Sequence, residues 1–135
     1  MSTEAENEAL VRAFLKAWEL LDPDELIAYF AADAVYHNIP RSPVAGTDAI
    51  RELLALILAG HDAMRFEVLT LVAKDDVVVA ERIDHLWAGD VHVPLPVMGI
   101  FELRDGRIAA WREYYDPAPV EPLRAVLQQR QAWPE

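Results

Sequence analysis

The chain has 135 residues, 53% of them hydrophobic and 26% charged, a composition typical of a globular domain and not of a disordered one. Its net charge of −11 disfavours nucleic acid and anionic membrane surfaces as partners. It has no cysteine, which excludes disulfides, thiolate metal sites and cysteine nucleophiles. No apolar run approaches the roughly 20 residues of a membrane span, and the acidic amino terminus is unlike a signal peptide. We expect residues 1–135 to form one cytoplasmic domain.

The first 60 residues predict three helices and one short strand. Thr3 and Glu6 have the spacing of a capping box, ahead of apolar residues that recur every three or four positions up to Leu21. Asp22 and Pro23 are the cap and first residue of a second, short helix. The run 34–39 predicts a strand, and Thr47 is the expected cap of a third helix that ends near Gly60.

The second half of the chain predicts a β-meander and one more helix. Four β-branched runs are separated by turn signals, of which Asp105-Gly106 is a good hairpin turn: Phe66–Ala73, Val77–Trp87, Val91–Leu103 and Arg107–Tyr115. A further helix is expected around Leu123 and Leu127. Helices followed by an antiparallel meander indicate an α+β fold. We expect a curved, mostly antiparallel mixed sheet wrapped around the N-terminal helices, forming a cone with an internal pocket.

Two polar residues share one face of the central predicted strand. Side chains alternate along a strand, so Arg82 and Asp84 lie on the same face as Val78, Ala80 and Leu86. A charged pair among apolar residues suggests a polar site inside a pocket. The competing interpretation is a surface salt bridge on a sheet that is apolar on its other face, and alternation alone does not decide between the two.

Other polar residues give weaker signals. Tyr36 and Asn38 share a face of the short strand, and Asp116 closes the last strand before Pro117, where an aspartate is usually a turn residue. The four histidines lack metal-ligand spacing, and the chain has neither a phosphate-binding glycine loop nor a Gly-x-Ser-x-Gly elbow. Glu113 alternates with Arg112 and Tyr114, and we expect it to face solvent or an interface.

Taken together, Tyr36-x-Asn38, Arg82-x-Asp84 and the late Asp116 resemble the active-site pattern of limonene-1,2-epoxide hydrolases. That family belongs to a broader group of cone-shaped folds, which includes nuclear transport factor 2, ketosteroid isomerases and polyketide cyclases of the SnoaL type. The resemblance spans most of the chain and implies an epoxide substrate, water as co-substrate and no cofactor or metal.

The residues themselves account for much of that chemistry. Epoxide opening needs a proton for the developing alkoxide and a base for the attacking water, which an acid and a carboxylate supply in one step. Two ionised aspartates beside Arg82 sum to −1, so one shared proton makes a buried cluster neutral. Either aspartate can hold that proton by this count. The resemblance implies Asp84 as the acid and Asp116 as the base, with water held by Tyr36 and Asn38.

Two other functions fit the same fold. A ketosteroid-isomerase-like or cyclase-like enzyme would use one carboxylate base and an oxyanion hole of a tyrosine and a protonated aspartate, but the first helix has no tyrosine. A non-catalytic binding or dimerisation module would not require two aspartates around one arginine. Turnover of an epoxide panel separates the three.

The apolar residues predict the substrate and the assembly. An apolar, terpene-like or lipid-like epoxide is expected in a pocket formed by Leu53, Ile57, Met64, Leu86, Met98 and Phe101. The opposite face of the central strand carries Val77, Val79, Ile83 and Trp87, which is too apolar for an open sheet in water. We therefore expect a homodimer that buries part of this face, as the family resemblance also implies.

Overall fold

The computed structural model describes residues 2–39 and 41–130. Its first α-helices are α1 (Glu4–Ala17), α2 (Pro23–Ile27) and α3 (Thr47–Ala59), and two strands separate α2 from α3. The predicted capping box of α1 is present: the Thr3 hydroxyl accepts from the Glu6 amide at 3.1 Å, and the Glu6 carboxylate accepts from the Thr3 amide at 2.8 Å. The Asp22 carboxylate accepts from the Asp24 amide at 2.9 Å and caps α2, with Pro23 as the first helical residue. Local signals thus place both helix starts as predicted.

The strands form one curved sheet in the order β2-β1-β6-β5-β4-β3. Their bounds are β1 (Phe30–Asn38), β2 (Val44–Ala45), β3 (Ala63–Lys74), β4 (Val77–Ala88), β5 (Val91–Arg104) and β6 (Arg107–Tyr114). Strands β3 to β6 form the predicted meander, and β1 joins it by pairing in parallel with β6. The sheet is therefore mixed and mostly antiparallel, and the α+β prediction is confirmed.

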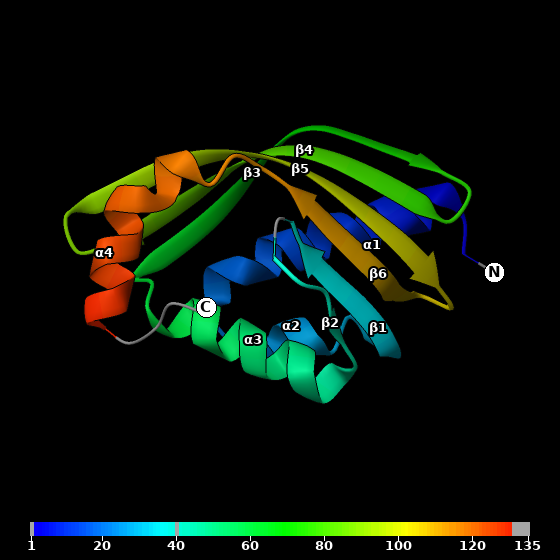
Figure 1. Ribbon diagram of the computed structural model, residues 1–135. Helices are drawn as coiled ribbons and strands as arrows, with labels where there is room; N and C mark the ends of the chain where they lie inside the picture. Colours follow the sequence, from blue (N-terminus) through cyan, green and yellow to red (C-terminus); the bar gives the residue numbers. More distant parts are fainter. Residues whose placement is uncertain (1, 40, 131–135) are drawn as a thin grey trace.

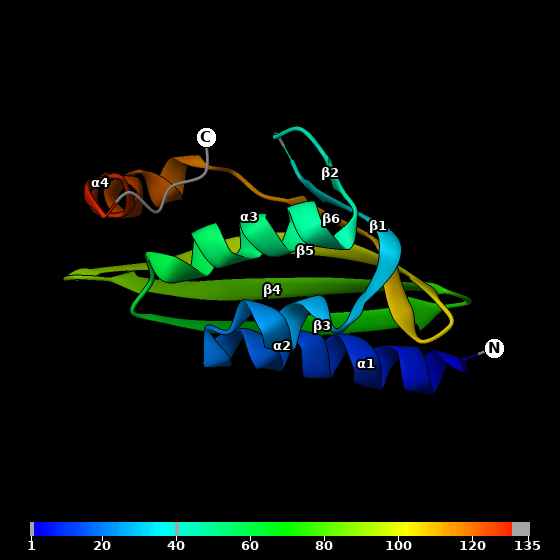
Figure 2. The same cartoon turned by 90° about the horizontal axis from the view of Figure 1, so that it is seen from below.

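The helices enclose a space on one side of this sheet. Figure 2 shows α1, α2 and α3 along that side, with the long strands behind them. The last helix, α4 (Glu121–Gln129), covers one end of the sheet and packs against β4 and β5 (Figure 1). This arrangement leaves the inner faces of β4, β5 and β6 pointing toward an interior surrounded by helices. None of the helices described is long and apolar enough to cross a bilayer.

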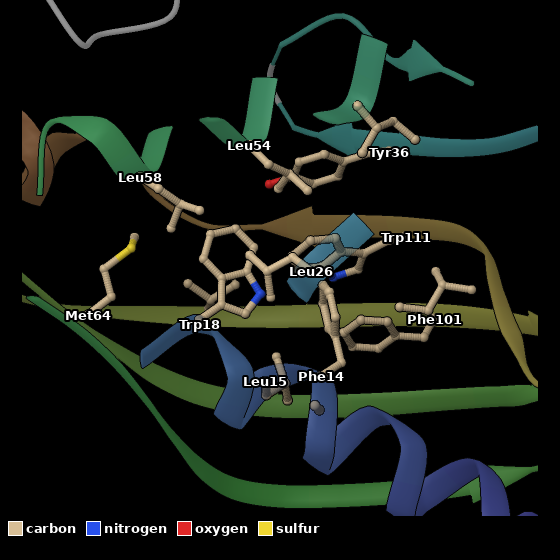
Figure 3. Close-up of a cluster of buried hydrophobic side chains, with 14 of the residues drawn as sticks. Phe14, Leu15, Trp18, Leu26, Tyr36, Leu54, Leu58, Met64, Phe101 and Trp111 are labelled. Atoms are coloured by element: carbon tan, nitrogen blue, oxygen red, sulfur yellow. The ribbon is translucent and has the colours of Figure 1, made fainter. Parts of the chain in front are cut away.

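Aromatic side chains fill part of that interior (Figure 3). Phe14 of α1 is fully buried and meets Trp111 of β6 edge to face at a centroid distance of 5.0 Å. The Trp111 ring also stacks on Phe101 of β5 at a centroid distance of 5.3 Å, and the Trp18 ring lies 5.9 Å from the Trp111 ring. Such pairs contribute about 0.5–1.5 kcal/mol each beyond the area that they bury. The cluster therefore fixes α1 against β5 and β6, which carry part of the site described below.

The structure corrects some predicted boundaries. Strand β1 begins at Phe30, four residues before the expected start, and β3 begins at Ala63. Thr47 does not cap α3, because it is the first helical residue and Gly46 precedes it with φ of +86°, a conformation that glycine adopts without strain. The Asp105-Gly106 turn is confirmed, with φ of +53° and +74°, as the tight hairpin requires.

Candidate active site

The predicted pair on β4 lies on the inner face of the sheet. Arg82 is fully buried and Asp84 is 6% exposed, so the interpretation as a surface salt bridge is wrong. The guanidinium donates from Nε to Asp84 Oδ1 at 2.9 Å and from Nη2 to Asp84 Oδ2 at 2.8 Å. A two-point contact of this kind fixes the plane of the carboxylate relative to the guanidinium.

A second carboxylate binds the same guanidinium, and it belongs to Glu113 of β6. Arg82 Nη1 donates to Glu113 Oε1 at 2.9 Å, Nη2 donates to Glu113 Oε2, and the Trp111 indole N–H donates to Oε1. Glu113 is 5% exposed, so the expectation that it faces solvent or an interface is wrong. Arg112 is the residue on the outer face, where it pairs with Glu102 at 2.5 Å.

Gly99 of β5 provides the space in which Arg82 and Glu113 meet. It pairs with Glu113 on β6 and with Ala80 on β4. A Cβ at this position would lie 2.3 Å from Glu113 Oε1 and 2.6 Å from Arg82 Nη1. A glycine inside a strand often marks such a close approach. This glycine is the sequence signal that could have identified Glu113 as the inward residue.

We expect Gly99→Ala to disrupt the buried cluster. The added methyl group must displace the Glu113 carboxylate or the Arg82 guanidinium from its buried hydrogen bonds. We therefore expect a loss of about 1–3 kcal/mol in the free energy of unfolding. Urea unfolding measures that loss. A free energy of unfolding within about 0.5 kcal/mol of the wild-type value would contradict this role of Gly99.

Asp116, the expected base, does not reach this cluster. It is exposed beyond the end of β6, and its Oδ1 accepts from the backbone N–H of Ala118 at 3.0 Å. This is the turn role that an aspartate before Pro117 commonly has. The prediction that Asp116 shares a pocket with Asp84 is therefore wrong, and Glu113 occupies the position expected of it.

Tyr36 and Asn38 lie beside Glu113, because β1 pairs in parallel with β6. Tyr36 is in register with Trp111, on which its ring stacks at 4.5 Å, and Asn38 is in register with Glu113. Burial raises the pKa of the Tyr36 phenol well above 10, and the nearby Glu113 charge adds to this effect. Tyr36 therefore stays protonated and can donate a hydrogen bond. Figure 3 shows its ring next to Trp111.

These polar groups lie in the wall of a cavity of about 370 Å³, within the usual size range of small-molecule pockets. Asp84, Glu113, Tyr36 and Asn38 all line it. Of the predicted apolar residues, Leu53, Ile57, Met64 and Leu86 line it as well. Met98 and Phe101 do not: Met98 is 42% exposed on the outer face, and Phe101 is fully buried in the aromatic core. The prediction was wrong at these two positions.

The cluster has one positive and two negative groups, all of them buried. Burial lowers the pKa of Arg82, but the charges of Glu113 and Asp84 outweigh it and raise that pKa, so Arg82 is always ionised. Burial raises the pKa of Glu113 above its ordinary value, although the charge and hydrogen bonds of Arg82 oppose the rise. These shifts favour a cluster that holds one proton and is neutral.

The raised pKa of Glu113 predicts how stability depends on pH. The native cluster of Arg82, Asp84 and Glu113 keeps one shared proton to a higher pH than the unfolded chain does, so the free energy of unfolding contains a contribution that falls as pH rises above 4.5. The fall is at most about 1.4 kcal/mol per pH unit. Glu113→Gln leaves Asp84 and Arg82 as a neutral pair with no shared proton to lose. We expect urea unfolding between pH 4 and 8 to show the wild type losing stability relative to Glu113→Gln as pH rises; a constant difference between the two proteins would contradict the assignment.

Comparison with known proteins identifies the family. Residues 5–123 match the family model described as the limonene-1,2-epoxide hydrolase catalytic domain. The chain belongs to the limonene-1,2-epoxide hydrolase family. It is 35% identical over 106 residues to the epoxide hydrolase EphG of Mycobacterium tuberculosis strain H37Rv, an alignment that covers 78% of this chain and 70% of EphG.

Solved structures agree with this family assignment. The structure of a limonene-epoxide-hydrolase-like epoxide hydrolase from M. tuberculosis superposes with a TM-score of 0.76 and 32% identity, over 93% of this chain and 92% of that one. A putative SnoaL-like polyketide cyclase from Jannaschia sp. CCS1 superposes with a TM-score of 0.78 at 16% identity, over 90% and 92% of the two chains. The second likeness shows a shared fold, as the resemblance to the broader group of cone-shaped folds predicted.

Three of the four histidines, His61, His85 and His92, make contacts outside the cluster. His85 and His92 stack on Trp87 on the outer face, and His85 Nε2 is 3.0 Å from Glu67 Oε1. His61 lines the cavity, where burial lowers its pKa and its Nδ1 lies 2.7 Å from the Ile57 carbonyl. Within residues 2–39 and 41–130, no three histidine or acidic side chains are placed to hold a metal ion.

Proposed function

We propose that this protein adds water to an apolar epoxide and forms a vicinal diol, in one step and without a covalent intermediate. One observation carries the proposal: a fully buried arginine holds two carboxylates, Asp84 and Glu113, in the wall of a largely apolar cavity. A carboxylic acid and a carboxylate fixed by the same guanidinium form a preorganised pair for general acid and base catalysis.

The strand register supports Glu113 as the base. Water needs a base and a second group to orient it, and Asn38 and Tyr36 flank Glu113 across the β1–β6 pairing. In the proposed complex, water donates one hydrogen to Glu113 and the other to the Asn38 side-chain carbonyl. The Tyr36 hydroxyl donates to one lone pair of the water, which leaves the second lone pair for the epoxide carbon.

Asp84 is then the acid. The water oxygen bonds to an epoxide carbon while the carbon–oxygen bond of the ring breaks, and Asp84 protonates the departing oxygen as Glu113 receives the proton of the water. The cluster therefore holds one proton before and after the step. Its charge stays near zero, which avoids creating a net charge in a site with little water. The proton returns from Glu113 to Asp84 before the next turnover.

The cavity supports a terpene-like or lipid-like substrate. Apolar side chains from α3, β3, β4 and β5 face its interior, and they include Leu53, Ile57, Met64, Leu86 and Leu95. Removal of apolar surface from water contributes about 25 cal/mol per Å², so such walls favour binding of a hydrocarbon skeleton. Carboxylates held by Arg82 supply the polar contacts at one position in the wall.

Turnover of a panel of uncharged epoxides tests the proposed function. We expect diol formation from terpene and long-chain alkyl epoxides, measured by gas chromatography. An enone shift of a steroid substrate without diol formation would instead support an isomerase, and binding without turnover would support a non-catalytic module. Either outcome would contradict the proposal.

We also propose that the protein is a homodimer that buries the outer face of the sheet. Apolar side chains run across that face in register, since Val72 pairs with Val79 and Val79 pairs with Ile100. Val72 and Val77 are 55% and 37% exposed. We expect sedimentation at micromolar concentration to give the dimer mass, and Val79→Asp to shift it toward the monomer. A wild-type protein that sediments only as a monomer would contradict the proposal.

A further inference from the structure

Three aromatic rings form a row across the sheet, one from each of β1, β6 and β5. Trp111 of β6 is in register with Tyr36 on one neighbouring strand and with Phe101 on the other. Both rings lie nearly parallel to the indole, at 9° and 14°, with centroid distances of 4.5 Å and 5.3 Å. Figure 3 shows the indole between them. The plane of Trp111 is therefore fixed by stacking on both of its faces.

The fixed indole directs its N–H at the proposed base. Trp111 and Glu113 are two residues apart on β6, so their side chains leave the same face of the sheet. The indole N–H donates to Glu113 Oε1, the oxygen that also accepts from Arg82 Nη1 at 2.9 Å. A buried indole N–H needs an acceptor whatever its role, so the consequences for the carboxylate decide whether this bond serves function as well as packing.

The hydrogen bonds leave the two oxygens of Glu113 unequal. Each carboxylate oxygen has about two acceptor sites. Within the described part of the chain, Oε1 accepts from both Arg82 Nη1 and the indole, whereas Oε2 accepts only from Arg82 Nη2. Oε2 therefore keeps the lone pair that can take a proton from water. Burial raises the pKa of Glu113, and the indole hydrogen bond is one of the contacts that oppose this rise.

We propose that Trp111 is a positioning residue of the active site: its indole N–H occupies Oε1 of Glu113 and thereby leaves Oε2 as the atom that receives the proton of the water. This inference rests on the proposed epoxide hydrolysis and adds a residue to its machinery. Trp111 acts through Glu113 and takes no proton itself. Its two stacking partners hold the N–H in the direction that this role requires.

Trp111→Phe and Trp18→Phe form a matched pair of variants. Both remove an indole N–H and the same ring volume from one aromatic cluster, in which the two rings lie 5.9 Å apart. The two side chains are buried alike, at 1% and 2% exposure, and both line the cavity. The indole N–H of Trp18 has no hydrogen-bond partner among the described residues. Loss of packing is therefore common to both variants, and only Trp111→Phe removes a hydrogen bond from Glu113.

The two carboxyl groups are the members of the cluster that can titrate between pH 4.5 and 9. Arg82 and Asp84 of β4, Tyr36 of β1 and Tyr115 beyond β6 are the charged or titratable groups near Glu113. Burial raises the pKa of both tyrosines, and the pKa of Arg82 is raised as well, so these three keep their protons throughout this range. Other charged or titratable residues of the cavity wall are retained in both variants: Arg41, His61 and Arg124.

We expect the rising limb of the pH profile of kcat/KM, measured with a neutral epoxide, to lie about 0.5–1.5 pH units higher in Trp111→Phe than in the wild type. A carboxylate with one donor fewer is more basic, so it is protonated at higher pH. The maximum rate should fall by about 3- to 30-fold, because the shared proton then resides more on Glu113 and less on Asp84. Trp18→Phe should keep the wild-type position of this limb. Thermal unfolding verifies that both variants are folded.

A readout without turnover separates this inference from the proposed hydrolysis. In nitrogen-15-labelled wild-type protein, each indole N–H gives its own NMR signal. We expect the Trp111 signal to move between pH 4.5 and 9 as its acceptor titrates, and the Trp18 signal to stay in place. A Trp111 signal that does not respond to pH, or a Trp111→Phe rate profile at the same pH as that of Trp18→Phe, would overturn the inference. Failure of the proposed hydrolysis would appear differently, as no diol from the wild type at any pH while the Trp111 signal still titrates.

Discussion

Glu113→Gln is expected to lower epoxide turnover by at least about 10³-fold while the protein stays folded, because a glutamine amide cannot accept a proton from water. The variant retains an acceptor oxygen for Arg82 and for the Trp111 indole, so the buried hydrogen bonds are largely preserved. Steady-state rates of diol formation, measured with circular dichroism of the same samples, separate loss of the base from loss of the fold.

Asp116→Asn is the matched control for this prediction. Asparagine keeps the side-chain oxygen that accepts from the Ala118 amide, and Asp116 does not line the cavity. We expect its rate of diol formation to stay within about threefold of the wild-type rate. An inactive Asp116→Asn together with an active Glu113→Gln would show that the base is Asp116 and that our assignment is incorrect.

Arg82→Lys is expected to cause the largest combined loss of activity and stability. Lysine keeps the charge but has no planar fork, so one ammonium cannot hold both carboxylates in fixed planes. Loss of a partner from a buried ionic network costs about 3–5 kcal/mol, and Arg82 is fully buried. We expect a loss in this range in urea unfolding, and a decrease in turnover of at least about 10²-fold in the fraction that remains folded.

Arg112→Lys provides the comparison on the opposite face of the same sheet. Arg112 pairs with Glu102 where both side chains are partly exposed, at 32% and 48%. Exposed pairs contribute about 0–1 kcal/mol, so we expect a small effect on stability and none on turnover. Similar losses for the two substitutions would contradict the distinct role of Arg82.

The fold could be predicted because its signals are local. Capping residues mark the starts of α1 and α2, and Asp105-Gly106 favours a hairpin independently of residues far away in the sequence. Thr47 shows the limit of such signals, because a threonine before an apolar run can be either the cap or the first helical residue. The choice depends on the φ of Gly46, which the sequence does not specify.

The site was only partly predictable because its members meet through long-range pairing. Alternation along β4 placed Arg82 and Asp84 on one face, and the structure confirms that face as the inner one. The second carboxylate depended on which residues of β6 face inward, and β6 pairs with β5 through an irregular register between Glu102 and Leu103. Two acidic residues, Glu113 and Asp116, were available within four positions. The folded chain distinguishes them, because Glu113 meets Arg82 beside Gly99, whereas Asp116 is exposed and accepts from the Ala118 amide.

Two arginines that line the cavity, Arg41 and Arg124, could not be predicted from the sequence. Arg41 lies in a connection after β1, and Arg124 lies on a helix that contacts the far ends of β4 and β5. Neither position has a periodicity that relates it to Arg82, because side chains from different elements converge only in the folded chain. Charge alone would have assigned both to the solvent-exposed surface.

A single turnover in oxygen-18 water tests the central claim, that Glu113 and Asp84 direct water itself onto the epoxide. Enzyme in excess over a neutral epoxide is quenched after one turnover, and mass spectrometry measures the label in the diol and in the intact protein. Direct attack by water predicts one labelled oxygen in each diol molecule and none in the protein. Unlabelled diol together with a labelled carboxylate in the protein would show an ester intermediate, and the proposed mechanism would then be wrong.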